Sequence, residues 1–415
     1  MMTDDRDIII KAEGLTLIFG KRKKEALELL NRGYSKTDIL KKTRCTIGVN
    51  KASFEIKKGE IFVIMGLSGS GKSSLIRCLN RLNEPTDGKV YFKDHNITRE
   101  TNKQLLHTRR TEMSMVFQKF GLLPHRTILE NAAFGLEIRG ETREQREEKA
   151  RIALKTVGLE GYEEQYPREL SGGMQQRVGL ARALANDTDV LLMDEAFSAL
   201  DPLIKSDMQD ELLQIQNKLH KTIVFITHDL NEAMKVGDRI AIMKDGVIEQ
   251  IGTAETILTS PATDYVEAFV ERVDRKTIIT AETLLFKHPT TVKLGKIGPK
   301  GVLHKMREAG LNVLPVVDNL DKFLGYVWLE DMIDLEKRKV QSIESALYSE
   351  VPSVLKSYTV EEMLPLITGH HYPLAVVDEE DGRLLGLVTQ TSLIIESTRY
   401  SKTEMNELID NANDL

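Results

Sequence analysis

Residues 66–73 read Gly-Leu-Ser-Gly-Ser-Gly-Lys-Ser, and these residue types in this order can hold the phosphates of a nucleotide. The glycines let the backbone turn so that its N–H groups point inward at phosphate oxygens. Lys72 carries positive charge for the β- and γ-phosphates, and the hydroxyl of Ser73 is a ligand for Mg²⁺. The segment therefore predicts a site for ATP with Mg²⁺. The residues expected to bind the nucleotide here are Gly66, Ser68, Gly69, Ser70, Gly71, Lys72, Ser73 and Ser74.

The motif stands in the structural context that it requires. Residues Ile61–Met65 form a short continuous apolar run, as expected for a buried parallel strand. Residues Ser74–Leu82 have the pattern of a helix, whose positive end would point at the phosphates. The alternative, a chance glycine-rich turn, would rarely fall between such a strand and such a helix.

Two carboxylates follow another apolar run, Val190–Met193. At the end of a buried strand, Asp194 would hold Mg²⁺, and Glu195 would accept a proton from an attacking water molecule. Taken alone, the pair could also be an acidic helix cap. Together with the phosphate loop it predicts hydrolysis of ATP.

Strand patterns surround these motifs, with one interruption. Residues 7–19 alternate as a strand does, and strands resume at Val49–Ile56. Between them, residues 21–44 hold nine Lys or Arg against three Asp or Glu, in a pattern typical of two short helices broken at Arg32-Gly33-Tyr34. Further predicted elements are a helix at Glu141–Val157, a buried strand at Thr222–Ile226, and an edge hairpin formed by Arg239–Met243 and Val247–Gly252 with Asp245-Gly246 at its turn.

A weak internal repeat begins after about residue 270. Leu314-Pro-Val-Val-Asp318 matches Leu374-Ala-Val-Val-Asp378, and each copy has a predicted helix before it and another after it. The repeat predicts a β-α-β-β-α unit that occurs twice. The last fourteen residues hold four carboxylates and one lysine, and we expect a polar, acidic tail.

Composition excludes several classes of protein. The chain has 415 residues, enough for two or three domains, and its net charge of −6 does not indicate a nucleic-acid binder. Its two cysteines, Cys45 and Cys78, have no metal-ligand spacing and suit a reducing compartment. No apolar stretch approaches the ~20 residues that span a bilayer, and the first residues are not typical of a secretory signal. We therefore expect any membrane role to come from a partner or from surface charge.

Leu170–Arg177 read Leu-Ser-Gly-Gly-Met-Gln-Gln-Arg and lie between the phosphate loop and Asp194. With this segment in place, residues 7–270 resemble the nucleotide-binding cassette of an ABC transporter. The resemblance implies a P-loop NTPase of α/β class, with a parallel core sheet, an antiparallel lobe and a helical lobe that carries the signature segment. It also implies a homodimer that holds two ATP molecules between its chains.

The resemblance assigns roles to further residues. Gln118 matches the glutamine that senses Mg²⁺ and faces the membrane subunit, and His228 matches the histidine that holds the γ-phosphate and the water. Asp201 ends Ser198-Ala-Leu-Asp201, which matches the loop that crosses the dimer interface. The residues matching those that contact ATP on the opposite subunit are Ser171, Gly172, Gly173 and Gln175.

One departure from the family pattern concerns adenine. The family usually has an aromatic residue about 25 positions before the phosphate loop, whereas Phe19 lies 47 positions before Gly66. Removing the basic segment 21–44 restores the usual spacing. We therefore expect Phe19 to stack on the base and residues 21–44 to be a basic helical insertion.

The tail repeat resembles a tandem pair of CBS domains, a regulatory module. We expect the cassette at residues 1–270, a linker at 271–282, the CBS pair at 283–400 and the tail at 401–415. A cassette with this module and this insertion resembles the ATPase of glycine betaine/proline importers. An importer of another solute, such as an amino acid, remains an alternative. A soluble ABC ATPase acting on nucleic acid or ribosomes fits less well, because the chain has neither a second cassette nor an inserted coiled coil.

Two regulatory hypotheses follow. The insertion would sense ionic strength at an anionic lipid surface, although a simple solvated basic face is an equal alternative and a DNA-binding helix pair a weaker one. The CBS pair would bind an adenine-type nucleotide, although it could be a purely structural dimerisation module. The pattern Gly-x-x-Thr/Ser-x-x-Asp of nucleotide-binding pairs is incomplete in both copies, with Trp328 before Asp331 in the first and Thr389 before Ser392 in the second. A two-fold symmetric ligand between two chains, such as cyclic di-AMP, fits better than a mononucleotide.

The resemblance also implies partners and a location. The expected partners are a membrane-spanning permease with a substrate-binding domain, a second copy of this chain and no nucleic acid. We expect the protein to be peripheral, at the cytoplasmic face of the cell membrane, with closure transmitted to the permease by the segment after Gln118, including Leu122–Arg126.

Overall fold

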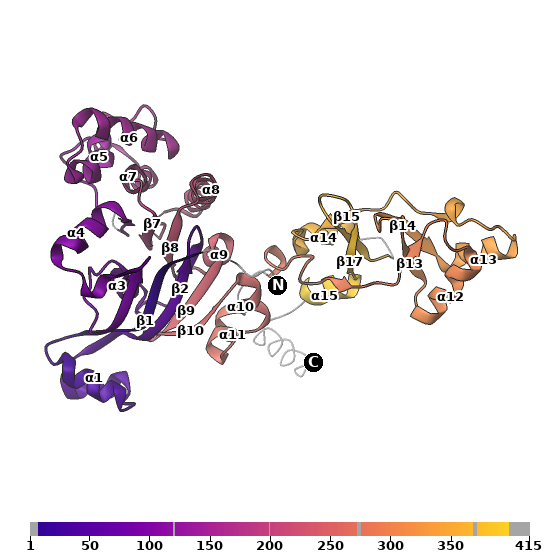
Figure 1. Ribbon diagram of the computed structural model, residues 1–415, viewed down its shortest axis with the longest axis horizontal. Coiled ribbons are helices and arrows are strands. Elements are labelled where there is room, and N and C mark those ends of the chain that lie inside the picture. The colour runs from indigo at the N-terminus through magenta and orange to yellow at the C-terminus, as the bar shows by residue number, and fades with distance from the viewer. Residues whose placement is uncertain (1–6, 119–120, 199, 272–274, 368–371, 398–415) are drawn as a thin grey trace, which may run out of the picture. The chain divides into compact units, whose positions relative to one another are not determined.

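The computed structural model describes residues 7–118, 121–198, 200–271, 275–367 and 372–397. The chain forms two compact units, Met1–Val270 and Glu271–Leu415, which are described separately below (Figure 1). Part of the predicted linker and the whole predicted tail lie outside the described residues. Among the helices that the structure describes, none is long and apolar enough to cross a membrane.

A six-stranded sheet with the order β10-β9-β3-β8-β7-β6 forms the centre of the first unit. The five strands from β9 to β6 are parallel, and only β10 pairs antiparallel, as expected for the predicted hairpin. The central strands are buried throughout and mainly apolar, because both faces of the sheet are covered. The strands are β3 (Ile61–Met65), β6 (Met113–Val116), β7 (Val190–Asp194), β8 (Thr222–Thr227), β9 (Arg239–Lys244) and β10 (Val247–Gly252).

A second sheet with the order β2-β1-β4-β5 is antiparallel and packs against the same core. The stacked rings of Phe54 and Phe62 join the two sheets, with centroids 5.4 Å apart. Its strands are β1 (Ile8–Phe19), β2 (Thr46–Lys57), β4 (Asp87–Phe92) and β5 (His95–Asn96). The strands predicted at 7–19 and 49–56 are confirmed.

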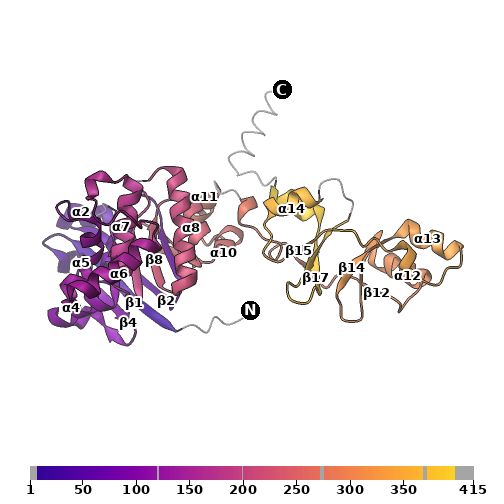
Figure 2. The same ribbon diagram turned by 90° about the horizontal axis from the view of Figure 1, so that it is seen from above.

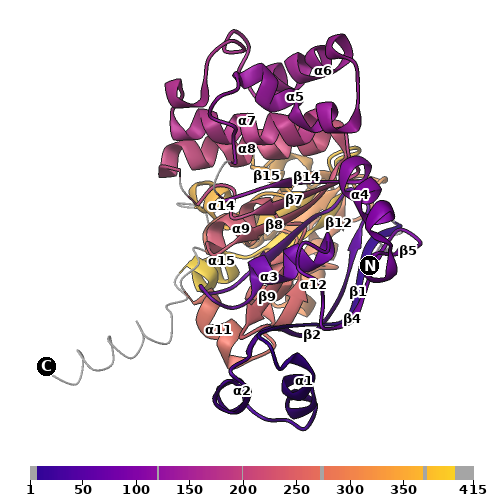
Figure 3. The same cartoon turned by 90° about the vertical axis from the view of Figure 1, so that its left-hand side faces the viewer.

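A helical lobe lies at one end of this unit, and the insertion lies at the other (Figure 3). The lobe contains α5 (Ile128–Arg139), α6 (Arg143–Thr156) and α7 (Gly172–Ala185), of which α5 and α6 begin at Thr capping boxes. Outside the lobe and the insertion, the described helices of the unit are α3 (Lys72–Leu79), α4 (Asn102–Thr111), α8 (Pro202–Leu219), α9 (Leu230–Val236), α10 (Ala254–Thr259) and α11 (Asp264–Val270), with short 3-10 turns at Ile97–Arg99 and Pro167–Glu169.

The basic segment forms the two helices that its pattern predicts, α1 (Lys23–Asn31) and α2 (Lys36–Thr43). A small apolar cluster fixes both helices on the ends of β1 and β2, with Ala26 and Ile39 buried against Ile18 and Ile47. The side chain of Ser35 caps the start of α2 by accepting a hydrogen bond from the Asp38 amide. The insertion is therefore packed onto the strand that ends at Phe19.

The second unit contains the predicted repeat, and each copy follows the order β-α-β-β-α (Figure 2). The first copy comprises β12 (Val292–Lys293), α12 (Pro299–Ala309), β13 (Val313–Val317), β14 (Phe323–Trp328) and α13 (Leu329–Lys337). The second comprises β15 (Ser353–Leu355), α14 (Val360–Ile367), β16 (Leu374–Val377), β17 (Leu384–Val388) and α15 (Gln390–Ser397), with 3-10 turns at Arg275–Thr277 and Glu344–Ala346 elsewhere in the unit.

A strand that precedes the first copy extends the sheet of the second. The short β11 (Phe286–Lys287), which precedes the first copy, pairs with β17 of the second. Residues Ile279 and Ala281, in the segment expected to be a linker, are buried. The amide of Ala281 also donates to the carbonyl of Tyr358, so this segment is tied to the second copy.

Candidate active site

The phosphate loop connects β3 to α3, and two of its glycines hold conformations that only glycine adopts easily. Gly66 has φ +150° and Gly71 has φ +106°. A Cβ on Gly66 would lie 2.2 Å from the carbonyl oxygen of Met243, and one on Gly71 would lie 2.2 Å from that of Gly48. Both positions therefore exclude side chains. The helix begins at Lys72, two residues earlier than its pattern predicts, and ends before Asn80.

Lys72 lies folded against the loop. Its Nζ donates to the carbonyl oxygens of Gly66 at 2.9 Å and Leu67 at 3.2 Å, and lies 3.7 Å from Oε1 of Glu195. The Lys72 side chain is only 4% exposed. Burial lowers the pKa of its ammonium group, and the Glu195 carboxylate opposes that shift.

Ser73 and Asp194 meet although 121 residues separate them, because Ser73 Oγ donates to Asp194 Oδ1 at 2.7 Å. The other carboxylate oxygen of Asp194 lies 3.0 Å from Nη2 of Arg77. Asp194 is 2% exposed, so Arg77 compensates a buried charge. Sequence reasoning missed Arg77. Its signal was the i, i+4 spacing from Ser73, which places both on one face of α3.

Glu195 follows β7 directly, and Nε2 of Gln118 donates to its Oε2 at 2.9 Å. Glu195 has φ +48°, a conformation that is uncommon for residues with a side chain. Ser198 donates its hydroxyl to the Glu195 carbonyl at 2.9 Å and stabilises this turn. The structure thus brings together Lys72, Gln118 and Glu195.

Phe19 lies beside the phosphate-binding helix. A Cβ on Gly48 would lie 2.8 Å from a Phe19 ring carbon and 3.3 Å from Ser74 Oγ. Phe19 is 43% exposed, so part of the residue is available to a ligand. Ser68 and Gly69 are also exposed, whereas Ser70 is buried.

Two predicted residues lie at the ends of neighbouring elements. His228 is exposed directly after β8, and the next residue, Asp229, caps α9 through hydrogen bonds from the amides of Asn231 and Glu232. Asp201 is exposed at the N-cap of α8. Nζ of Lys205 donates to Asp229 Oδ2 at 2.7 Å and joins α8 to α9. Ala199, between Ser198 and Asp201, lies outside the described residues.

The signature residues lie on the helical lobe, apart from α3 (Figure 3). Ser171 caps α7 by accepting a hydrogen bond from the Met174 amide, and both Ser171 and Gly172 are exposed. Gly173 is buried, and a Cβ there would lie 2.8 Å from a methyl carbon of Ile204 on α8. The side chain of Gln175 donates to the carbonyl of Leu170. The exposed start of α7 is thus available to another molecule.

A groove of about 360 Å³ lies between β6, α4 and the helical lobe. Its lining includes Phe117, the neighbour of Gln118, together with Phe134 and Ile138 of α5. The segment after the groove is tied to α5 by Asn131, whose side chain accepts from the Leu123 amide at 2.7 Å and donates to the Leu123 carbonyl at 3.1 Å.

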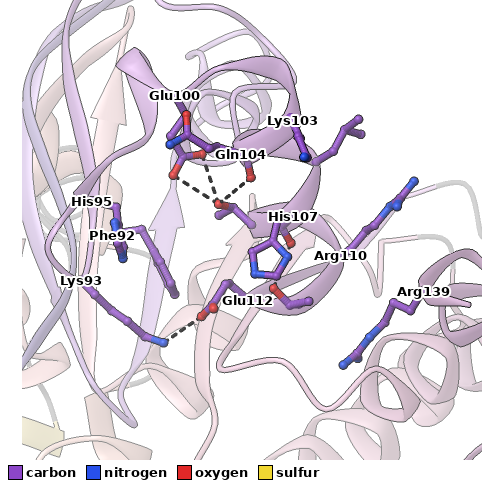
Figure 4. Close-up of a pocket in the computed structure, with 13 residues that line it drawn as sticks. Phe92, Lys93, His95, Glu100, Lys103, Gln104, His107, Arg110, Glu112 and Arg139 are labelled. Atoms are coloured by element: carbon purple, nitrogen blue, oxygen red, sulfur yellow. Dashed lines mark hydrogen bonds and ion pairs between the residues drawn. The ribbon is translucent and has the colours of Figure 1, made fainter. Parts of the chain in front are cut away.

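A larger cleft of about 980 Å³ shares Arg110 with this groove (Figure 4). Its two carboxylates are engaged within the cleft: Glu112 pairs with Lys93 at 2.8 Å, and Glu100 accepts from Thr108. Further basic side chains in the lining are Lys103, His107 and Arg139. The smaller groove lies at the boundary between the core and the helical lobe, whereas the larger cleft is lined mainly by α4 and by residues near β4 and β5.

Comparison with known proteins identifies the family. The ABC transporter family model matches residues 49–198, and the CBS domain model matches residues 343–398. The chain is 52% identical to the glycine betaine/carnitine transport ATP-binding protein GbuA of Listeria monocytogenes, over 93% of this chain and 96% of GbuA. It belongs to the family of ABC transporter ATP-binding subunits. The predicted fold class and family are therefore confirmed.

Other members of the family give the same picture. The glycine betaine transport ATP-binding protein OpuAA of Bacillus subtilis is 51% identical over 95% of this chain and 93% of its own length. Among solved structures, a dimeric ATP-binding cassette with bound ADP and phosphate is 32% identical, with a TM-score of 0.51, over 59% of this chain and 99% of its own. That structure is a dimer.

Proposed function

We propose that this chain is the ATPase of an importer for a compatible solute of the glycine betaine type. The observation that carries the proposal is the convergence of Lys72, Asp194 and Glu195 in a chain about half identical to glycine betaine transport subunits over nearly its whole length. Hydrolysis of ATP would drive inward movement of the solute. The protein would act as a dimer at the cytoplasmic face of the membrane, with a permease that carries a substrate-binding domain.

The residues divide the chemistry among them. The loop amides and Lys72 would hold the phosphates, and Phe19 would stack on adenine. Ser73, Asp194 and Gln118 offer the oxygen ligands that Mg²⁺ prefers, and Mg²⁺ would neutralise phosphate charge. Glu195 would take the proton of the attacking water, and His228 would orient it.

The dimer completes the site. Ser171, Gly172 and the amide end of α7 would contact the γ-phosphate held by the other chain, because a helix start offers free N–H groups and positive potential. Gly173 and Gln175 would shape this helix start, and Asp201 would lie at the interface between chains. Each ATP would then lie between Lys72 of one chain and Ser171 of the other.

The groove at Phe117 is suited to the permease. The apolar part of its lining, which includes Phe117, would take an apolar side chain of a partner. Phe117 is directly followed by Gln118, whose side chain donates a hydrogen bond to Glu195. Hydrolysis of the γ-phosphate bond would therefore affect the groove and the segment Leu122–Arg126 through the side chain of Gln118. This short connection supports the predicted route of coupling.

Reconstitution tests the function. The chain would be assembled with its permease in liposomes, and ATP-driven uptake would be measured for glycine betaine, carnitine, proline and methionine. We expect uptake of the quaternary amines, and none with Lys72→Ala. Preferential uptake of methionine would overturn the solute assignment, and ATP hydrolysis that requires nucleic acid would overturn the transport assignment.

We also infer that the insertion responds to salt at an anionic membrane. The seven cations that we expect to meet the lipid surface are all exposed: Lys21, Arg22, Lys23, Lys24, Lys41, Lys42 and Arg44. Two apolar side chains, Tyr34 and Leu40, are exposed among them at 39% and 47%. This mixture suits a lipid surface, where each cation gains about 1 kcal/mol that salt screens.

Substitution of these seven residues by Gln tests the salt response. In liposomes with anionic lipid, we expect the wild type to be activated by rising internal salt and the substituted chain to be active at low salt. Liposomes of neutral lipid give the matched control. If the dependence of activity on salt and lipid is unchanged, the insertion would be a solvated basic face without a sensing role.

For the second unit, we infer a regulatory ligand at a dimer interface, cyclic di-AMP being the candidate. The single-chain pattern remains incomplete: the Thr389 hydroxyl is engaged with Ser392 at the start of α15, and Trp328 occupies the equivalent position in the first copy. Ile394 and Ile395 of α15 are 47% and 53% exposed, which suits contact with a second chain.

Calorimetry on the full chain tests this ligand. One cyclic di-AMP bound per two chains, with slower ATP hydrolysis, would support the interfacial site. AMP bound once per chain would instead indicate a site within one CBS pair. ATP would be tested on the Lys72→Ala variant, so that binding at the phosphate loop does not interfere. If cyclic di-AMP, AMP and ATP all fail to bind at micromolar concentrations, the second unit would have a purely structural role.

A further inference from the structure

We propose that Trp328, Tyr348 and Tyr372 form a binding site for a quaternary ammonium group on the second unit. These three residues, the aromatic corner, come from the end of β14, the segment before β15 and the residue shortly before β16. The choice of a methylated amine as the physiological ligand rests on the proposed function. The binding chemistry rests on the rings alone.

The rings are arranged as walls rather than as a stack. The Trp328 and Tyr348 centroids are 6.5 Å apart with planes at 82°, and those of Trp328 and Tyr372 are 6.4 Å apart with planes at 65°. Tyr348 is 49% exposed, and Trp328 and Tyr372 are partly exposed. Partly exposed aromatic rings at steep angles to one another can contact a rounded cation on more than one side.

The backbone holds this geometry before any ligand arrives. Tyr326 and Tyr348 exchange backbone hydrogen bonds of 3.0 and 2.9 Å beside Trp328. This approach is close enough that a Cβ on Gly325 would lie 2.0 Å from the Tyr348 carbonyl oxygen, so Gly325 is required. The site would therefore pay little conformational entropy on binding.

The third wall is fixed from inside the unit. Tyr326 is fully buried, and its hydroxyl donates to the carbonyl of Pro373 at 2.6 Å. The Tyr326 ring stacks on that of Tyr372, with centroids 5.4 Å apart. Tyr326 thus contacts the backbone of Tyr348 and the ring of Tyr372. These contacts explain how segments distant in sequence form one corner.

The ligand chemistry follows from the ring faces, which carry negative potential and attract cations. A methylated ammonium group is also apolar at its surface, so it loses little hydration when it contacts the rings. A nucleotide fits less well here, because Trp328 stands where nucleotide-binding CBS pairs place a hydroxyl for phosphate. The corner is thus suited to the transported class of solute.

The single tryptophan of the chain makes the test direct, because Trp328 is itself a wall. The full chain, without permease, would be titrated with glycine betaine and with tetramethylammonium chloride while tryptophan emission is recorded. Glycine and sodium chloride at equal concentrations are the matched controls. We expect a saturable change with the methylated compounds only.

Tyr348→Leu is the variant of choice, because its side chain is half exposed and its backbone bonds remain. We expect its affinity for both probes to fall about tenfold, with Tyr348→Phe close to the wild type. A response equal to that of the controls, or unchanged in Tyr348→Leu, would overturn the proposal. Failure of betaine uptake with binding intact would instead overturn only the proposed transport function.

Discussion

At the scale of single residues, side chains of the candidate active site make hydrogen bonds to one another and to the phosphate loop. Binding of MgATP would replace some of these bonds by contacts to phosphate and Mg²⁺. Lys72 bonds to carbonyls of its own loop, and Ser73 bonds to Asp194. Glu195 accepts from Gln118 in a turn with positive φ, so its position depends on these partners. The side chains are thus placed near their proposed ligands while their hydrogen bonds are satisfied within the protein.

Replacing Glu195 by Gln tests its role as the base. The amide keeps the shape of the side chain but cannot accept the proton, so we expect ATP hydrolysis to slow by about 10²–10⁴-fold. ATP binding should persist, and the variant should accumulate as an ATP-bound dimer, detected by size-exclusion chromatography. Near-normal turnover in the assembled transporter would contradict the assignment.

At the scale of elements, the basic insertion touches the nucleotide site at two places. It begins after Phe19, and its helix α2 carries Lys36, whose Nζ lies 3.1 Å from where a Cβ on Gly246 would be. The Gly246 amide donates to the carbonyl of Ser70 in the phosphate loop at 2.7 Å. Burial lowers the pKa of Lys36, and the nearby Asp245 carboxylate opposes that shift.

Lys36→Met should therefore weaken ATP binding by about two- to fivefold, the size expected when a partly exposed lysine loses its attraction to a nearby carboxylate. The loosened Asp245-Gly246 turn would hold the phosphate loop less firmly, so KM for ATP should rise while kcat changes little. Lys36→Arg should restore the wild-type value. Lys41→Met, on the exposed side of α2, is the control, and an equal effect there would show that only general charge matters.

At the scale of the whole molecule, each unit has its own core. The core of the first unit is formed by the two sheets of the cassette. In the second unit, a separate apolar cluster forms the core of the first repeat copy. Separate cores lead us to expect that the units unfold in separate steps.

Scanning calorimetry checks this independence. We expect two unfolding transitions, and MgADP should raise the midpoint temperature of the cassette's transition only. The reason is that a ligand at 100 times its Kd stabilises the unit that binds it by ~2.7 kcal/mol. Lys72→Ala should abolish the shift. A single transition that moves as a whole with nucleotide would show that the units are coupled.

The sequence by itself determined the features that are local in the chain. The phosphate loop, the strand before it, the hairpin at Asp245-Gly246 and the two helices of the insertion depend on residues close together, whose conformational preferences act directly. The repeated unit was also visible, because each copy carries its own apolar pattern. Family motifs predicted Gln118, whose side chain contacts Glu195, and His228, whose role stays a prediction.

Only the tertiary structure decided which distant residues meet. Asp194 ends β7, and Ser73 lies on α3, which follows β3. The strand β8 separates β3 from β7 in the sheet, and no local pattern in the sequence encodes this strand order. Arg77 became part of the site for this reason alone. The pairing of β11 with β17 and the aromatic corner likewise depend on contacts between segments far apart, which form only when the whole unit packs.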